Sequence, residues 1–241
     1  MAETSASNNA SDKHSPSDIF DELVSLGFST QALDALPAVL EATQLVEFAP
    51  GESIFYEGKD VDALYVIREG RIKLLNYLKN GRARIVRLHN RASILGLNGL
   101  MDEPHSHEAV AIDEVQVYQI PMPLIMAAKD KDPAIYNHLL QLLQDYLKMA
   151  DIWITDFSTG AIRARVARLL VFLVNNDLET GPCEVSLLTV DEMADILGVT
   201  PESISRIMAD MKRKKILQET GSDSPVHYMC DIKQLKRETE V

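Results

Sequence analysis

The chain has 241 residues, enough for two domains with separate cores, and carries 24 basic against 36 acidic side chains. An acidic total is unusual for a DNA-binding protein, but from Ala161 onward 11 basic residues face 13 acidic ones, so residues 1–160 hold −10 of the net −12. The C-terminal third is nearly neutral, and the local placement of Lys and Arg decides whether it contacts phosphate.

The two cysteines, Cys183 and Cys230, are not clustered, which excludes a four-cysteine iron–sulfur cluster or zinc site. They fit a reducing compartment, either as small structural residues or as a redox sensor. The chain has no run of 18 apolar residues, so we expect no membrane-spanning helix. The polar N-terminus is no signal peptide; we expect residues 1–27 to be a disordered leader and the protein to be cytoplasmic.

From about Leu40 to Pro121, short runs of alternating apolar and polar residues predict half-buried strands. These runs are residues 53–56, 63–67, 71–75, 83–88 and 115–120. Pro50-Gly51, Glu57-Gly58, Glu69-Gly70 and Asn80-Gly81 mark turns, the last being a strong hairpin signal. We therefore predict a small β domain, a roll or barrel, over residues 28–131.

A helical period then runs through residues 132–158 and carries two apolar seams with alternating four- and three-residue spacing. The first seam is Ile135, Leu139, Leu142, Tyr146, Met149 and Trp153. The second is Leu140, Leu143, Leu147, Ala150, Ile154 and Phe157. Two seams need two neighbours, most simply the β domain and a second copy of the same helix. The alternative is a helix buried inside a monomer.

After a predicted helix at 161–174 and strand at 184–187, the sequence predicts a helix-turn-helix. Thr189 caps a first helix and Glu192 completes a capping box. Gly198 supplies the turn, and Thr200 caps a second helix that begins at Pro201. Runs at 216–218 and 226–229 predict a two-stranded wing. The alternative is a capped helical hairpin in a protein core.

The second helix presents Glu202, Ser205 and Arg206 on one polar face, because three- and four-residue spacings coincide there. Arg can bind guanine through O6 and N7, and Glu can accept from the amino group of cytosine. The basic run at 212–215 is either a phosphate contact or a favourable charge at the helix C-terminus.

A glycine-punctuated β domain, a long helix and a winged helix, in this order, resemble the CRP/FNR family of bacterial transcription regulators over residues 28–235. The motifs that carry the resemblance are Pro50-Gly51-Glu52 with Gly58 and Gly70, Ile120-Pro121, and residues 201–206. It implies an α+β fold: a cyclic-nucleotide-binding-like β-roll (28–131), a dimerisation helix (132–158) and a winged helix-turn-helix (159–241). It also implies a homodimer that binds an inverted repeat in double-stranded DNA, with RNA polymerase as a partner.

The recognition helix resembles that of the FNR branch, which carries Glu, two other residues and then Ser-Arg. The residues that the resemblance assigns to DNA are Thr200, Glu202, Ser203, Ser205, Arg206 and Lys212. Pro201 stands where the cyclic-AMP-responsive branch has a base-contacting Arg, so we expect a DNA site of the FNR type.

The sensor segment departs from both branches. Leu97 replaces the ribose-binding Glu of cyclic-AMP binders, and His107 and Glu108 replace the phosphate-binding Arg-Ser pair. Glu108 would repel a phosphate, so we expect neither cyclic AMP nor, without four cysteines, an iron–sulfur cluster. The candidate effector pocket consists of Gly96, Leu97, Asn98, His105, His107 and Glu108.

Other functions remain open. His105 and His107 would lie on one side of the chain if this segment is extended, and could then ligate haem iron or another metal in a gas or redox sensor; the alternative is a polar surface loop. His89 and His138 are weaker candidates for that role. A second alternative is a regulatory subunit whose β domain binds a small ligand and whose C-terminal helices bind protein. With no phosphate loop, nucleophile elbow or metal-ligand helix in the sequence, we predict no enzymatic activity.

Overall fold

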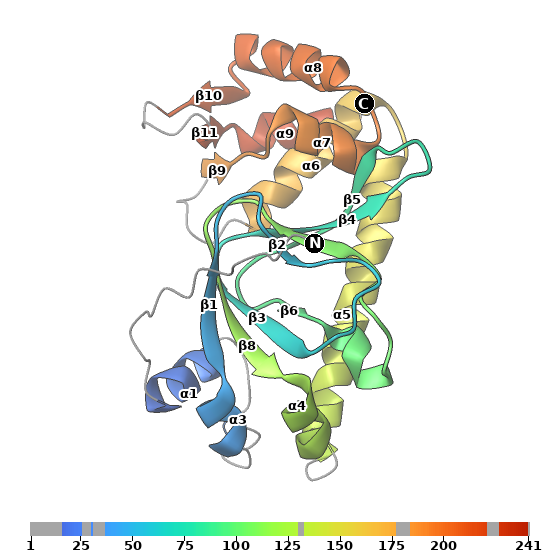
Figure 1. The fold of residues 1–241 in the computed structure, drawn as a ribbon. Coiled ribbons are helices and arrows are strands. Elements are labelled where there is room, and N and C mark those ends of the chain that lie inside the picture. The colour runs from blue at the N-terminus through green and yellow to red at the C-terminus, as the bar shows by residue number, and fades with distance from the viewer. Residues whose placement is uncertain are drawn as a thin grey trace.

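The structure is a computed structural model that describes residues 16–25, 30, 37–129, 133–176, 184–220 and 227–240. An N-terminal β-roll, one long helix and a C-terminal domain of helices around a small sheet follow one another along the chain (Figure 1). This arrangement confirms the predicted α+β class. Among the helices described, none is both long and apolar enough to cross a membrane.

The β-roll consists of two four-stranded antiparallel sheets, ordered β1-β8-β3-β6 and β2-β7-β4-β5. The strands are β1 Gln44–Phe48, β2 Ser53–Phe55, β3 Ala63–Glu69, β4 Ile72–Tyr77, β5 Ala83–His89, β6 Ile94–Leu95, β7 Glu108–Ala111 and β8 Val115–Pro121. The five predicted runs correspond to β2, β3, β4, β5 and β8. The alternation is real, since one face of each sheet packs apolar side chains such as Ile67, Ile72 and Val117 into a shared core.

Glycine is required at the turn between β3 and β4. Gly70 has φ +85°, and a Cβ atom there would lie 2.3 Å from the carbonyl oxygen of Glu114. The predicted hairpin at Asn80-Gly81 joins β4 to β5, with Gly81 at φ +77°. Both turn predictions are confirmed, because only glycine adopts such angles without strain.

Part of the predicted leader is folded. Residues Pro16–Ser25 form helix α1, in which Ile19 and Leu23 are buried, and the Glu22 carboxylate pairs with Arg68 at 2.6 Å. The expectation of disorder is therefore wrong for these residues, because the four-residue spacing of two apolar side chains gives α1 a face to bury. The remaining helices of this half are α3 Pro37–Ala42, η1 Leu97–Met101 and α4 Met122–Lys129. Residues 1–15 lie outside the described part.

The first seam of the long helix α5, Pro133–Ser158, contacts other elements of the same chain. Ile94 donates its N–H to the Tyr146 hydroxyl at 3.0 Å, and that hydroxyl donates to the Ile94 carbonyl. Leu142 packs against the β-roll, and Trp153 is buried in the C-terminal core. The prediction that this seam faces the β domain is confirmed for Leu142 and Tyr146, whereas Trp153 packs in the C-terminal core; the side chains of Ile135 and Leu139 lie outside the described residues.

The C-terminal domain packs its helices against a three-stranded sheet of order β10-β11-β9. Its elements are α6 Ile162–Asn176, β9 Glu184–Ser186, α7 Val190–Leu197, α8 Pro201–Arg213, β10 Leu217–Glu219, β11 His227–Cys230 and α9 Ile232–Glu238. The sequence predicted α6 to α8 and all three strands to within about two residues, but not α9. The tip of the predicted wing, residues 221–226, lies outside the described part.

The two domains are joined by polar and apolar contacts. Lys73 on β4 pairs with Glu192 on α7 at 2.7 Å, and the two side chains are 18% and 14% exposed. Leu75 and Ile85 of the β-roll belong to the same apolar cluster as Leu197 of the helix-turn-helix. A change in the β-roll therefore has a direct physical route to the C-terminal domain.

We predict that Glu192→Gln lowers the free energy of unfolding by about 1–3 kcal/mol at pH 7. Burial raises the pKa of Glu192, but hydrogen bonds from Lys73 and Thr189 outweigh it, so the pKa lies below 4.5. A depressed pKa in the folded state gives stability that is present above the unfolded-state pKa and is lost as the pH falls through the folded-state pKa. The difference between wild type and variant should therefore shrink below about pH 4.

Urea titrations at pH 7 and at acid pH measure this effect. Gln at the same position still serves a capping box, so the substitution isolates the charge. Asp145→Asn is the control, because Asp145 and Lys148 form an exposed pair on α5 that should contribute little. Equal unfolding free energies for wild type and Glu192→Gln at pH 7 would contradict the prediction.

Candidate nucleic-acid interface and effector site

The helix-turn-helix is built as the sequence predicts. Thr189 donates its N–H to Glu192 at 2.9 Å and its hydroxyl accepts from the Glu192 N–H at 3.2 Å, so both halves of the capping box form. Thr200 caps α8 by accepting from the Ser203 N–H at 3.4 Å. Gly198, at φ +62°, closes α7, and a Cβ atom there would collide with the Arg84 guanidinium.

Helix α8 has a buried face and an exposed polar face. Ile204, Met208 and Met211 are buried, and exposed Glu202, Ser205 and Arg206 lie on the opposite side; we call these three exposed residues the α8 polar face. Figure 1 shows α8 at the outer end of the C-terminal domain, away from the β-roll.

Two charged side chains of the α8 polar face are available for contact with bases. Hydrogen bonds from its own backbone N–H and from Thr200 lower the pKa of Glu202, so it is ionised at neutral pH. Arg206 is exposed and makes no ion pair or hydrogen bond with the described residues. A free guanidinium and a carboxylate on one face can read a guanine and a cytosine.

Lys212 has a different environment from the one predicted. Its ammonium group donates to Glu219 and to the Tyr228 hydroxyl, both at 2.8 Å, and lies 4.7 Å from the Tyr228 ring centre. Lys214 pairs with Asp210 at 3.1 Å, and Arg213 pairs with the same carboxylate. These contacts favour the second interpretation of the basic run, in which charges stabilise the end of α8 and anchor the wing.

Sequence reasoning missed the arginines of α6, which orient the helix-turn-helix. Arg163 pairs with Asp210 of α8 at 2.7 Å and with Glu238 of α9. Arg165 donates to the Phe157 carbonyl at 2.7 Å and to the last carbonyl of α7, that of Leu197. Arginines in an otherwise apolar helix were the available signal, because a long charged side chain there needs a partner from another element.

The second seam of α5 is largely uncovered. Leu140, Leu147 and Ile154 are 61%, 69% and 64% exposed, and Leu143 and Ala150 lie beside them; we call these five residues the α5 stripe. The assignment of Phe157 to this seam is wrong. Its ring is fully buried, with centroids 4.9 Å from Trp153 and 5.5 Å from Phe172, because α5 ends inside the C-terminal core.

The predicted effector segment forms a tight cassette between β6 and β7. Gly96 has φ +88°, and a Cβ atom there would lie 2.5 Å from the carbonyl oxygen of Ala63. Leu97 is buried, and Asn98 donates its side-chain amide to the Ser106 hydroxyl at 2.8 Å. The apolar side chain of Leu97 therefore occupies the position at which, by the family resemblance, cyclic-AMP binders carry a ribose-binding Glu.

Glu108 is used within the β-roll. Its carboxylate accepts hydrogen bonds from the Ser53 hydroxyl and the Tyr77 hydroxyl, each at 2.6 Å. These bonds connect β7 to β2 and β4, so Glu108 holds the sheet together rather than pointing free into a pocket.

The two cassette histidines have different surroundings. His105 is buried and stacks on Phe55 with ring centroids 3.6 Å apart, whereas His107 is half-buried beside Arg87. Burial lowers the pKa of both, and Arg87 lowers that of His107 further. Both precede β7, so the condition that they lie on an extended strand is not met. In the described part of the chain, no group of three His, Cys, Asp or Glu residues could hold a metal ion, and His138 has no described side chain.

A β-roll with a cassette, a long helix and a winged helix-turn-helix, in this order, form the architecture of a DNA-binding protein. Residues 45–131 match the cyclic nucleotide-binding domain family, and residues 164–238 match the Crp-like helix-turn-helix domain family. The chain belongs to the CRP/FNR family of transcription regulators, as the resemblance implied.

Individual relatives have different names and cover similar shares of this chain. The fumarate and nitrate reduction regulatory protein of Vibrio cholerae is 26% identical over 84% of this chain and 82% of its own. A CRP-like cAMP-activated global transcriptional regulator of Mycobacterium tuberculosis is 25% identical over 78% of this chain and 85% of its own. The structure of FixK2 from Bradyrhizobium japonicum superposes with a TM-score of 0.73 at 19% identity, covering 81% of this chain and 96% of that one, which shows the common fold.

Proposed function

We propose that the protein is a homodimeric regulator that reads an inverted-repeat DNA site through α8. The α8 polar face carries this proposal: Glu202, Ser205 and Arg206 are exposed together on a helix that Thr200 caps and Arg163 braces. Thr200 and Ser203 lie at the N-terminus of that helix, where backbone N–H groups favour a phosphate. Lys215, exposed just after α8, replaces Lys212 as the proposed phosphate contact.

The α5 stripe is the proposed dimer interface. Burying a large apolar side chain contributes roughly 1.5–3 kcal/mol, and a twofold interface counts each position twice. The stripe contains no charged side chain, so pairing needs no signal. A signal would then act on the orientation of the DNA-binding domains, not on assembly.

We propose that this signal is not cyclic AMP. Buried Leu97 cannot bind a ribose hydroxyl, and the negative charge of Glu108 would oppose a phosphate. The regulatory-subunit alternative has less support, because a protein-binding hairpin does not need an unpaired Arg206 beside Glu202 on its outer face.

We predict that selection from a random DNA pool recovers an inverted repeat with half-sites about 10 base pairs apart, centre to centre. A twofold axis through α5 presents two recognition helices one turn of B-DNA apart, about 34 Å. Recovery of single half-sites would contradict binding as a dimer. Enrichment no better than chance would contradict sequence-specific DNA binding. Tighter binding on adding cyclic AMP would contradict the proposal about the signal alone.

A further inference from the structure

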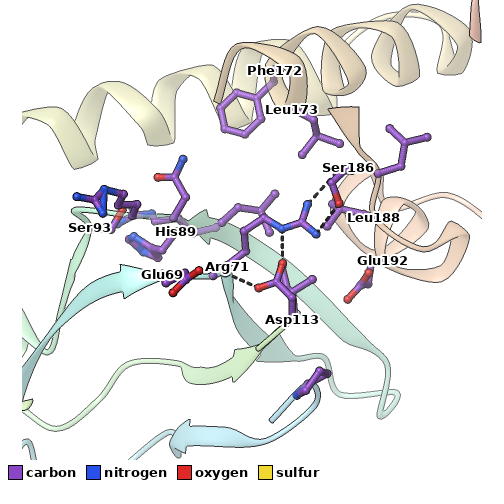
Figure 2. A pocket seen from close by; sticks show the side chains of 18 of the residues that line it. Glu69, Arg71, His89, Ser93, Asp113, Phe172, Leu173, Ser186, Leu188 and Glu192 are labelled. Atoms are coloured by element: carbon purple, nitrogen blue, oxygen red, sulfur yellow. Dashed lines mark hydrogen bonds and ion pairs between the residues drawn. The ribbon is translucent and has the colours of Figure 1, made fainter. Parts of the chain in front are cut away.

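A cavity of about 760 Å³ lies between the β-roll and the C-terminal domain. Its volume falls within the range of small-molecule sites. Figure 2 shows Arg71 and His89 on the β-roll side, with Phe172 and Leu173 descending from the helix opposite. No cassette residue from 96 to 108 lines this cavity, so it is separate from the effector pocket that the sequence predicted.

His89, at the end of β5, lines the cavity with an unused polar atom. The side chain is buried, and its Nε2 atom has no hydrogen-bond partner in the described structure. Burial, reinforced by Arg87 and His107, lowers the pKa of His89 to about 3. The imidazole is therefore neutral at physiological pH, with a nitrogen free to donate or accept one hydrogen bond.

Arg87, two residues earlier on β5, lines the same cavity without a counter-ion. Its guanidinium lies 5.2 Å from the ring centre of Tyr146 on α5 and makes no ion pair or hydrogen bond with the described residues. Burial lowers the pKa of Arg87, which shows that its charge is partly desolvated. A desolvated, unpaired charge is costly, and an anion is the partner that removes this cost.

The other charged groups of the cavity leave that charge uncompensated. Arg71 pairs with Asp113 at 2.6 Å and donates to Ser186 at 2.9 Å, and Glu192 is paired with Lys73. Glu69 and Glu114 also line the cavity but are exposed, so water and salt screen their charges, and Arg91, another lining cation, donates to the Arg68 carbonyl.

We propose that this interdomain cavity binds a small organic anion. Arg87 and His89 would bind its carboxylate, phosphate or sulfonate group, and an aromatic or aliphatic body would pack against Phe172 and Leu173. Because both domains line the cavity, an occupant would fix their relative orientation. That regulatory consequence rests on the proposed DNA-binding function, whereas the binding site itself does not.

Anilinonaphthalene sulfonate, an aromatic anion, is a suitable probe. Trp153 is the one tryptophan of the chain, and its ring centroid lies 6.1 Å from that of Phe172, so energy transfer from Trp153 detects a probe bound in or near the cavity, and the variants below distinguish the cavity from neighbouring surfaces. We expect saturable binding of one probe per chain in the full-length protein without DNA. Arg87→Gln should weaken this binding by about tenfold or more, the size of a lost charge-assisted hydrogen bond.

Matched variants separate this site from general charge and from other apolar surfaces. Arg82→Gln removes an exposed charge on the β4–β5 turn outside the cavity and should leave binding unchanged. Neutral phenylnaphthylamine should bind wild type and Arg87→Gln alike. If circular dichroism shows that Arg87→Gln is unfolded, Arg87→Lys is compared with Arg82→Lys in its place.

The proposal would be overturned if the Arg87 and Arg82 substitutions weakened probe binding equally. It would also be overturned if only Leu147→Asp abolished probe binding, because the probe would then lie on the α5 stripe. Because the titration contains no DNA, its failure and a failure to select an inverted repeat are distinguishable results.

Discussion

The substitution Leu147→Asp is expected to convert the proposed dimer into monomers and to abolish specific DNA binding. Leu147 is 69% exposed at the middle of the α5 stripe, where a twofold axis would bring the two copies together. Two carboxylates would then face each other in an apolar interface, at a cost on the order of several kcal/mol. Sedimentation velocity of the protein at micromolar concentration, without any added effector, measures the change.

Two substitutions on the same helix serve as controls. Gln141→Asp introduces the same charge at an exposed position away from the stripe and should leave the dimer intact. Tyr146→Asp should instead reduce thermal stability, because it removes the hydroxyl that bonds to Ile94 on β6. A wild-type protein that is monomeric until a ligand is added would refute the stripe as a constitutive interface.

Arg206→Ala is expected to lower specific affinity by about 1–3 kcal/mol and to relax the preference at one guanine. Arg206 is exposed and makes no hydrogen bond or ion pair in the described structure, and its electrostatic attraction to Glu202 acts at the surface, so stability should change little. Binding titrations on the selected site and on versions with single base changes measure both affinity and discrimination.

Lys215→Ala provides the contrast. As a phosphate contact it should weaken binding to all sequences alike and reduce the salt dependence. Lys212→Ala should act through the wing instead, because it frees Glu219 and Tyr228. Base discrimination that survives intact in Arg206→Ala would show that α8 does not read DNA through this residue.

The sequence by itself determined the features whose cause is local. The caps at Thr189 and Thr200, the turns at Gly70 and Gly81, and the strand alternation all depend on hydrogen bonds or side-chain periods within a few residues. Such signals survive without knowledge of the fold. The α8 polar face could be predicted for the same reason, since helical spacing alone places its members together.

Only the tertiary structure decided which residues the long side chains contact. Phe157 lies inside the core although its spacing continues the stripe, and Lys212 binds the wing although it follows a recognition helix. The interdomain cavity is the clearest case, because its walls come from strands, helices and turns spread between Pro50 and His227. Desolvation of Arg87 and His89 depends on the packing of β5 against Tyr146 of α5, and no local pattern encodes it.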